Sequence, residues 1–303
     1  MNELKNKAAS IRAKLTNIAR AERIDFDALL LRYFQERFIY RLATCEYMTN
    51  FVLKGGLFLV CLEVPRARPT KDIDFLAEKI DNSQKKLEDI IKKISQISGD
   101  DGVVFNPTSV RSEIIKEETD YEGIRLKITA KLGQARKVLQ IDIAFGDTIT
   151  PHAEIMDFPT ILENEMPRIK VYSIESVISE KFEAMIKLGT VNSRMKDFYD
   201  IYTLSTSHSF FGSLLKKTII NTFKRRKTEV PESPGVFQEE FCEDKTRKQQ
   251  WKAFLRKTKL PGMPDDFLEI ITKIKVFLQP IILAIRAKKK FDKTWNIDKG
   301  QWK

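Results

Sequence analysis

The sequence predicts an α+β protein in which a domain built around a mixed β-sheet is followed by an α-helical domain. Two stretches, residues 123–129 and 138–145, alternate apolar and polar side chains, which is the period-two pattern of strands. From Ser173 onward, apolar residues recur at helical spacing for most of the remaining chain. We therefore expect a sheet domain with N-terminal helices over residues 1–160 and a basic helical domain over residues 161–303.

The first fifty residues predict helices, because apolar side chains recur at helical spacing and an aspartate, Asp25 or Asp27, could cap a helix start. Two short apolar runs separated by a glycine pair come next. They predict a strand or helix, a turn and then a helix, in this order: residues 51–54, Gly55-Gly56 and residues 57–62.

The rest of the first domain predicts strands around one helix. Residues 72–76 read as a strand, residues 79–97 as an amphipathic helix and residues 99–102 as a turn. Residues 133–136 lie between the two alternating stretches and predict a hairpin turn. In the helical domain, the proline-containing residues 228–235 predict the clearest interruption.

Composition excludes several classes of protein. With 42% hydrophobic and 31% charged residues, the chain is globular and not disordered. It contains no apolar run of about 18 residues, so we expect no membrane-spanning helix and a cytoplasmic location. The three cysteines have no CxxC spacing and predict neither a zinc site nor a disulfide framework.

Charge is distributed unevenly along the chain. The net charge is +11, and 22 Lys and Arg against 11 Asp and Glu lie from Ser205 onward, whereas the two kinds balance before Ser205. The excess includes the basic runs 224–227 and 288–290. Such a region favours contact with a polyanion such as a nucleic acid. The alternative is a Lys-rich solvated surface without a partner, and we expect Trp251 and Phe254 to be core residues.

Two aspartates have a spacing typical of a metal site. Residues i and i+2 of a strand point to the same face, so Asp72 and Asp74 would present two carboxylates together. Carboxylates on a rigid strand suit Mg²⁺ or Mn²⁺, which prefer oxygen ligands and bridge proteins to phosphates. Asp142 lies on an alternating strand, and would complete a group of three if the two strands are neighbours. The alternative is a solvent-facing pair on an exposed strand.

A lysine in the helical domain is a further candidate. On a helix over residues 174–188, Lys181 falls on a largely apolar stripe, which indicates snorkelling, an ion pair or direction into a site. Shortly after it comes a second polar cluster, for which the alternative is a surface ladder of salt bridges: Arg194, Lys196, Asp197 and Asp200.

Several motifs, taken in order, resemble the AbiEii/AbiGii-type nucleotidyltransferase toxins, whose fold is that of DNA polymerase β-like transferases. The motifs are Lys54-Gly55-Gly56, Arg68-Pro69-Thr70-Lys71-Asp72-Ile73-Asp74, Glu180-Lys181-Phe182-Glu183-Ala184-Met185 and Arg194-Met195-Lys196-Asp197-Phe198-Tyr199-Asp200. The resemblance covers residues 25–205. One departure is Leu57, where many members have Ser or Thr directly after the glycines. We therefore expect backbone amides and Lys54 to make more of the triphosphate contacts.

The resemblance implies transfer of a nucleoside monophosphate from an NTP to an acceptor, expected to be RNA and above all tRNA, by a toxin with a cognate antitoxin. It implies that Asp72 and Asp74 bind metal, that Lys181 holds the triphosphate, and that Asp197 or Asp200 is a catalytic or acceptor-orienting acid. The catalytic set is Asp72, Asp74, Asp142, Lys181 and Asp197. The nucleotide-binding set is Lys54, Gly55, Gly56, Thr70, Lys71, Lys181, Arg194, Lys196 and Asp200.

Two other functions are compatible with the sequence. The same chemistry could act on a protein hydroxyl or a small molecule, although the basic helical domain favours a nucleic acid. Alternatively, the chain could be a catalytically silent module that binds nucleic acid or a partner protein. The intact pair of aspartates argues against that module, whereas the missing loop hydroxyl at Leu57 favours it.

Overall fold

The computed structural model describes residues 2–62, 68–116, 122–260 and 262–303. The chain divides into two compact units. The first consists of the described residues within 1–63, 69–146 and 154–171. The second consists of those within 64–68, 147–153 and 172–303. The chain therefore passes between the units several times.

The first unit is built around a seven-stranded mixed sheet with the order β3-β4-β5-β2-β1-β7-β6. Strand β2 runs parallel to β5 and β1 runs parallel to β7, whereas the other neighbouring pairs are antiparallel. The strands are β1 (Phe51–Lys54), β2 (Asp72–Ala77), β3 (Val103–Lys116), β4 (Glu122–Leu132), β5 (Ala135–Phe145), β6 (Glu154–Asp157) and β7 (Arg168–Val171). The predicted mixed sheet is confirmed, and it includes a β6–β7 hairpin that the sequence analysis did not predict.

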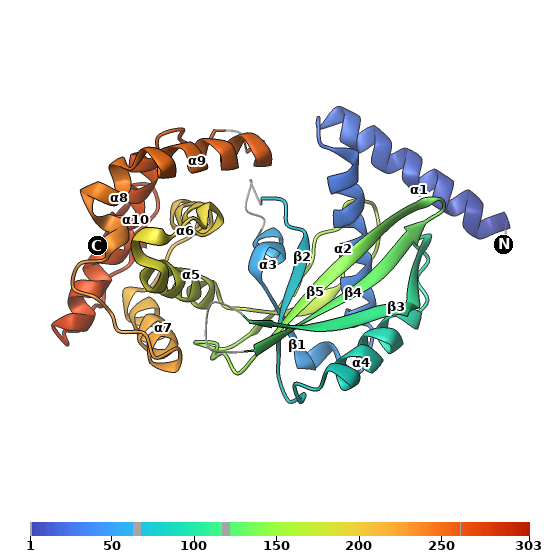
Figure 1. The fold of residues 1–303 in the computed structure, drawn as a ribbon, viewed down its shortest axis with the longest axis horizontal. Helices are drawn as coiled ribbons and strands as arrows, with labels where there is room; N and C mark the ends of the chain where they lie inside the picture. The colour runs from blue at the N-terminus through green and yellow to red at the C-terminus, as the bar shows by residue number, and fades with distance from the viewer. Residues whose placement is uncertain (1, 63–67, 117–121, 261) are drawn as a thin grey trace. The chain divides into compact units, whose positions relative to one another are not determined.

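Helices α2 and α4 pack against this sheet, α2 near β5 and α4 near β3 (Figure 1). The helices of the first unit are α1 (Asn2–Ala21), α2 (Phe26–Ala43), α3 (Gly55–Cys61) and α4 (Gln84–Gln96), with a 3₁₀ turn at Met48–Asn50. Asp25 caps α2, because its side chain accepts a hydrogen bond from the backbone of Ala28 at 2.9 Å. Helix α4 begins later than the predicted residue 79, since Lys79 has a left-handed φ of 59° and Ser83 caps the helix.

A buried ion pair anchors α2 to the segment before β3. Arg41 donates to Asp101 at 2.7 and 3.1 Å, and both side chains are 2% exposed. The same guanidinium also donates to the carbonyl of Val103 and lies over the ring of Phe105. Because every part of this arginine is paired or stacked, the pair fixes the helix against the sheet without leaving a buried charge uncompensated.

The second unit is mostly helical. Its helices are α5 (Ile174–Leu188), α6 (Met195–Ser207), α7 (Gly212–Arg225), α8 (Glu239–Glu243), α9 (Lys245–Thr258) and α10 (Phe267–Arg286), with 3₁₀ turns at Gly189–Val191 and Gly235–Phe237. Trp251 is fully buried against Phe267, as expected for a core residue, and Phe254 is half-buried beside it. No helix among the described residues is long and apolar enough to cross a bilayer.

The last residues of the mostly helical second unit form a feature that was not predicted. After α10, the strands β8 (Trp295–Asn296) and β9 (Gln301–Trp302) form a small antiparallel hairpin. Trp295 and Trp302 pack with Phe277 of α10, at centroid distances of 4.8 and 5.6 Å. This aromatic packing holds the hairpin on the helix. Strands of two residues are too short to show a pattern in the sequence.

Candidate active site

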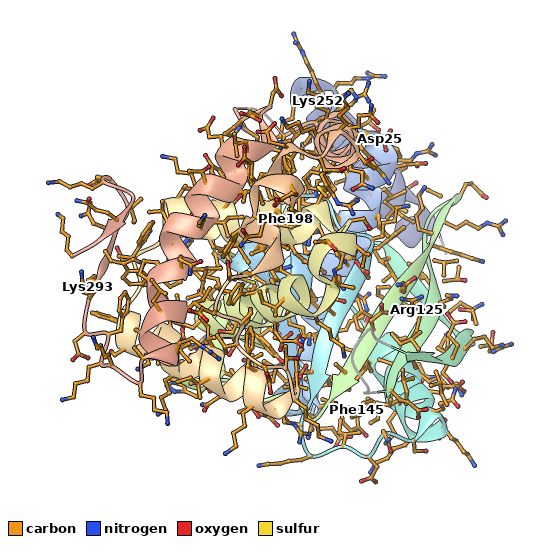
Figure 2. All side chains as sticks on the ribbon, turned by 60° about the vertical axis from the view of Figure 1, so that its left-hand side comes forward. Asp25, Arg125, Phe145, Phe198, Lys252 and Lys293 are labelled. Carbon is orange, nitrogen blue, oxygen red and sulfur yellow. The ribbon has the colours of Figure 1, made fainter. Side chains whose placement is uncertain are left out.

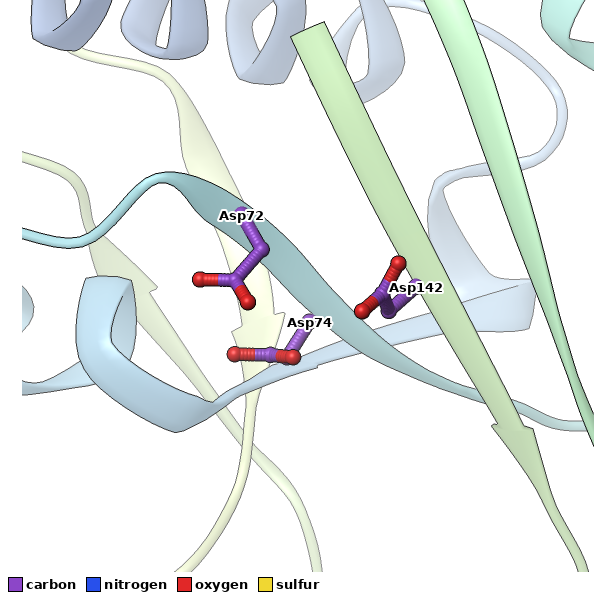
Figure 3. Close-up of side chains that lie close together, drawn as sticks. All are labelled: Asp72, Asp74 and Asp142. Atoms are coloured by element: carbon purple, nitrogen blue, oxygen red, sulfur yellow. The ribbon is translucent and has the colours of Figure 1, made fainter. Parts of the chain in front are cut away.

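Two aspartates of β2 and one of β5 form a cluster of carboxylates. Asp72 and Asp74 share one face of β2, whereas Ile73 and Phe75 are buried on the other. Strand β5 pairs with β2 in a register that places Asp142 opposite Asp74. One carboxylate oxygen from each aspartate lies within 4.8 Å of the other two, and the side chains turn toward the same space (Figure 3). The structure thus brings together the three aspartates that the sequence analysis grouped.

The glycine pair packs closely beside the cluster, Gly55 against Asp74 and Gly56 against Thr70. Gly55 has a φ of +67°, and a Cβ added to it would lie 1.9 Å from Oδ2 of Asp74. A Cβ on Gly56 would lie 2.8 Å from Cβ of Thr70. Both positions therefore exclude a side chain, which allows the backbone at the start of α3 to approach the carboxylate directly. Lys54 pairs with Asp74 across β1 and β2, so it projects from the same face of the sheet.

Asp72 is oriented by the residue two positions before it. The hydroxyl of Thr70 donates to Oδ1 of Asp72 at 2.6 Å. The carbonyl of Thr70 in turn accepts a hydrogen bond from Nε2 of Gln35, a fully buried residue of α2, at 3.3 Å. Gln35 was not among the predicted site residues, although its place between apolar positions of a predicted helix is a signal that could have identified it. Lys71, between Thr70 and Asp72, is exposed.

Arg125 of β4 is a second component that the sequence analysis missed. Its guanidinium binds both carboxylate oxygens of Asp142, at 2.9 and 2.8 Å, and Gln140 donates to the same carboxylate at 3.2 Å. Arg125, labelled in Figure 2, lies directly opposite Asp142 in the β4–β5 register. The two-pronged pairing fixes the plane of the Asp142 carboxylate. It also places a positive charge beside the cluster.

The other predicted polar residues form a separate network within the second unit. The ammonium of Lys181 lies 2.8 Å from Oδ1 of Asp197 and 2.6 Å from Oδ2 of Asp200. Arg194 binds the second oxygen of Asp197 at 2.6 Å. Arg68 binds Asp200 through two hydrogen bonds of 2.8 and 2.9 Å. Three cations thus surround two carboxylates.

This network is buried, so a surface ladder of salt bridges is the wrong description. Asp197 and Asp200 are fully buried, whereas Lys196 is exposed. Burial alone would raise the pKa of Asp197, but the Lys181 ammonium and the Arg194 guanidinium outweigh it and lower that pKa to about 2. Burial acts to lower the pKa of Lys181, yet its two carboxylate partners raise it. Both groups therefore stay charged at neutral pH.

The fold and the motifs have counterparts among known proteins. A family model described as the nucleotidyl transferase AbiEii toxin of a Type IV toxin–antitoxin system matches residues 37–273. A solved structure of a candidate nucleotidyltransferase from H. pylori has a TM-score of 0.50 and 17% identity, over 88% of this chain and 99% of that one. JHP933 from Helicobacter pylori has a TM-score of 0.49 and 16% identity, over 87% of this chain and 95% of that one. No curated protein matches the sequence.

The seven-stranded mixed sheet and the helical unit that follows it are thus the fold of a nucleotidyltransferase. The family model spans well over half of the chain, and the chain belongs to the AbiEii nucleotidyltransferase toxin family. The protein is therefore a nucleotidyltransferase, the class of enzyme that the motifs around Gly55 and Asp72 indicated.

Proposed function

We propose that this enzyme uses a divalent metal ion to transfer a nucleoside monophosphate from an NTP to RNA, with tRNA as the first acceptor to test. We further propose that it acts as the toxin of a pair with a separately encoded antitoxin, as the family description indicates. The observation that carries the catalytic part is the convergence of three carboxylates beside a glycine pair that leaves no room for side chains.

The donor set of the cluster fits Mg²⁺ or Mn²⁺. Asp72, Asp74 and Asp142 offer only oxygen atoms, which are the ligands these ions prefer, and the three ligand oxygens lie within 4.8 Å of one another. Asp72 and Asp74 would hold the ion, with Asp142 as a third ligand that also remains bonded to Arg125. When bound, the ion supplies positive charge against the negative charge of the phosphates.

The residues around the cluster are suited to position a nucleotide. Lys54 projects from the same face as Asp74, and the backbone of Gly55 lies directly against the Asp74 carboxylate. We propose that Lys54, Gly55 and Gly56 contact the triphosphate, because phosphoryl-type transfer depends mainly on positioning and charge neutralisation. Further nucleotide contacts are proposed from the family motifs: Thr70, Lys71, Lys181, Arg194, Lys196 and Asp200.

The protonation state of Asp197 decides between two roles proposed for it. A carboxylate with a pKa of about 2 is a weak base at neutral pH. We therefore propose that Asp197 positions Lys181 and Arg194, with which it forms ion pairs, and does not deprotonate the acceptor.

The acceptor is proposed from charge. The excess of 22 basic over 11 acidic residues from Ser205 onward favours a polyanion over a small neutral molecule. RNA supplies both the negative charge and a terminal hydroxyl that could be the nucleophile.

The test is to incubate the protein with each α-³²P-labelled NTP in turn, with Mg²⁺ and total cellular RNA. Label should enter RNA of tRNA size, and Asp72→Asn should abolish the transfer without changing the melting temperature by more than a few degrees. Asp89→Asn, a matched change of an exposed aspartate on α4, should retain full activity. Transfer by Asp72→Asn at the wild-type rate would overturn the metal assignment. Label on protein and not on RNA would overturn the acceptor.

The toxin role has its own test. Inducible expression of the wild type should slow bacterial growth, whereas Asp72→Asn should not. Equal inhibition by both proteins would show that any toxicity is independent of nucleotide transfer.

A further inference from the structure

A basic surface with an exposed aromatic ring lies where the start of α7 meets the segment after α10. The amide of Gly212 donates to the carbonyl of Lys293 at 2.7 Å, and Phe211 forms a β-bridge with Thr294. The ammonium of Lys216 also donates to the carbonyl of Lys289. These interactions join two segments that are more than seventy residues apart in the sequence. Figure 2 labels Lys293 on the second of them.

Phe211 is exposed for a reason that the backbone explains. The backbone at Phe211 is extended, so the side chains of Phe210 and Phe211 point to opposite sides. Phe210 is 1% exposed and packs on Phe277, whereas Phe211 is 66% exposed. A Cβ added to the next residue, Gly212, would lie 2.4 Å from Cδ1 of Phe291, so that position excludes a side chain. The geometry thus holds one aromatic ring in solvent.

The two segments are strongly basic. Residues 208–228, which include all of α7, contain six Lys and Arg and no Asp or Glu, and residues 286–303 contain seven Lys and Arg against two Asp. Four of those six cations, residues 224–227, lie at the other end of α7 from Phe211, and Arg226 among them is 7% exposed and pairs with Asp147, Glu180 and Glu183. In contrast, Lys289 and Lys293 are exposed and Lys216 is half-buried. The charge beside Phe211 therefore faces solvent.

We propose that Phe211, Lys216, Lys289 and Lys293, the Phe211 surface, bind a single-stranded segment of the RNA acceptor. A nucleobase stacks on the ring of Phe211 while the three lysines bind phosphates on either side. The proposal rests on the proposed transfer to RNA and adds the surface that receives it. An acidic protein partner is disfavoured, because the large exposed hydrophobic residues described in these segments are few and scattered: Phe211, Ile220 and Ile297.

The test measures binding of a fluorescein-labelled, single-stranded RNA 12-mer by anisotropy over a range of salt concentrations. Phe211→Ala should weaken binding about tenfold, whereas Phe211→Tyr should retain it, because either ring can stack on a base. Lys289→Glu combined with Lys293→Glu should reduce the slope of log K against log salt by about one for each lysine–phosphate ion pair that the substitutions remove. Lys252→Glu, a reversal at an exposed lysine of α9, is the matched control for Lys293→Glu alone and should change affinity less than that single variant does.

Nucleotide binding separates this proposal from the proposed function. Binding of Mn²⁺ and NTP should be unchanged in all of these variants. RNA binding by the wild type that is equally strong in Phe211→Ala and in the double lysine variant would overturn the Phe211 surface and leave the transfer reaction intact. No RNA binding by the wild type would overturn it as well. So would a competition in which polyglutamate displaces the RNA from the wild type as readily as from Phe211→Ala. Loss of NTP binding in Asp72→Asn, with NTP binding retained in the surface variants, would support the active-site assignment and the independence of the Phe211 surface from it.

Discussion

Replacement of Gly55 by alanine probes the close approach of the glycine pair to the metal-site aspartates. The added Cβ would lie 1.9 Å from Oδ2 of Asp74, whereas Cβ atoms essentially never approach other atoms within 3.0 Å. The carboxylate or the loop must therefore move by about 1 Å. Displacement of a reacting group by that distance can reduce the rate about 100-fold. The left-handed φ of +67° adds a cost in folding free energy of about 1–2 kcal/mol.

The assay has three readouts: the rate of labelled nucleotide transfer, the Kd for Mn²⁺ measured by electron paramagnetic resonance, and the melting temperature. Gly55→Ala should lower the rate about 100-fold and weaken Mn²⁺ binding, with a fall of a few degrees in melting temperature.

Gly133→Ala is the matched control for backbone strain. Gly133 has a φ of +57°, but the nearest atom to its added Cβ is 3.7 Å away, an ordinary van der Waals distance. This variant should show the same fall in melting temperature with a wild-type rate and Mn²⁺ affinity. The reasoning is refuted if Gly55→Ala keeps the wild-type rate, or if Gly133→Ala loses as much activity as Gly55→Ala.

The other predictions concern ion pairs. Arg125→Gln removes a cation that competes for Asp142, so Mn²⁺ without nucleotide should bind about two- to fivefold more tightly in a titration; weaker binding would contradict this. Lys181→Met leaves two buried aspartates short of a cation and should lower the unfolding free energy in urea by about 3 kcal/mol. Because the pKa of Asp197 is lowered from 3.8 to about 2, its stabilisation is complete above pH 4 and is lost as pH falls toward 2; the stability difference between wild type and Asp197→Asn should shrink over that range. Asp101→Asn should cost about 3–5 kcal/mol, since it strands a buried arginine, while Mn²⁺ affinity stays unchanged.

The Asp72–Asp74 pair and the face of Asp142 could be predicted from local patterns, whereas the meeting of the three carboxylates depends on the pairing of β2 with β5. The spacing of Asp72 and Asp74 places both on one face of any strand, and the alternation around Asp142 identifies its face independently. The turn between β4 and β5 could also be predicted from the sequence, because Gly133 readily takes the positive φ that such a turn requires. Each of these features depends on residues close together in the sequence.

The partners of these residues could not be predicted, because they depend on register and on distant segments. Arg125 meets Asp142 only if β4 and β5 pair in one particular register, and a slip of one residue would turn it to the other face. Arg68 binds Asp200, which is 132 residues away. Strands β6 and β8 are too short, at four and two residues, to show an alternating pattern.

The route of the chain between the two units has a consequence for how such a protein can be rearranged. The last strand of the first unit is β7, which pairs in parallel with β1 more than a hundred residues earlier. Residues 147–153, which precede β7 in the sequence, belong to the second unit. Arg68 likewise belongs to the second unit although sequence of the first unit flanks it. Neither unit therefore corresponds to one continuous stretch of gene. Exchange of a single continuous stretch of gene would not transfer the helical unit intact, because Arg68 and residues 147–153 would stay behind.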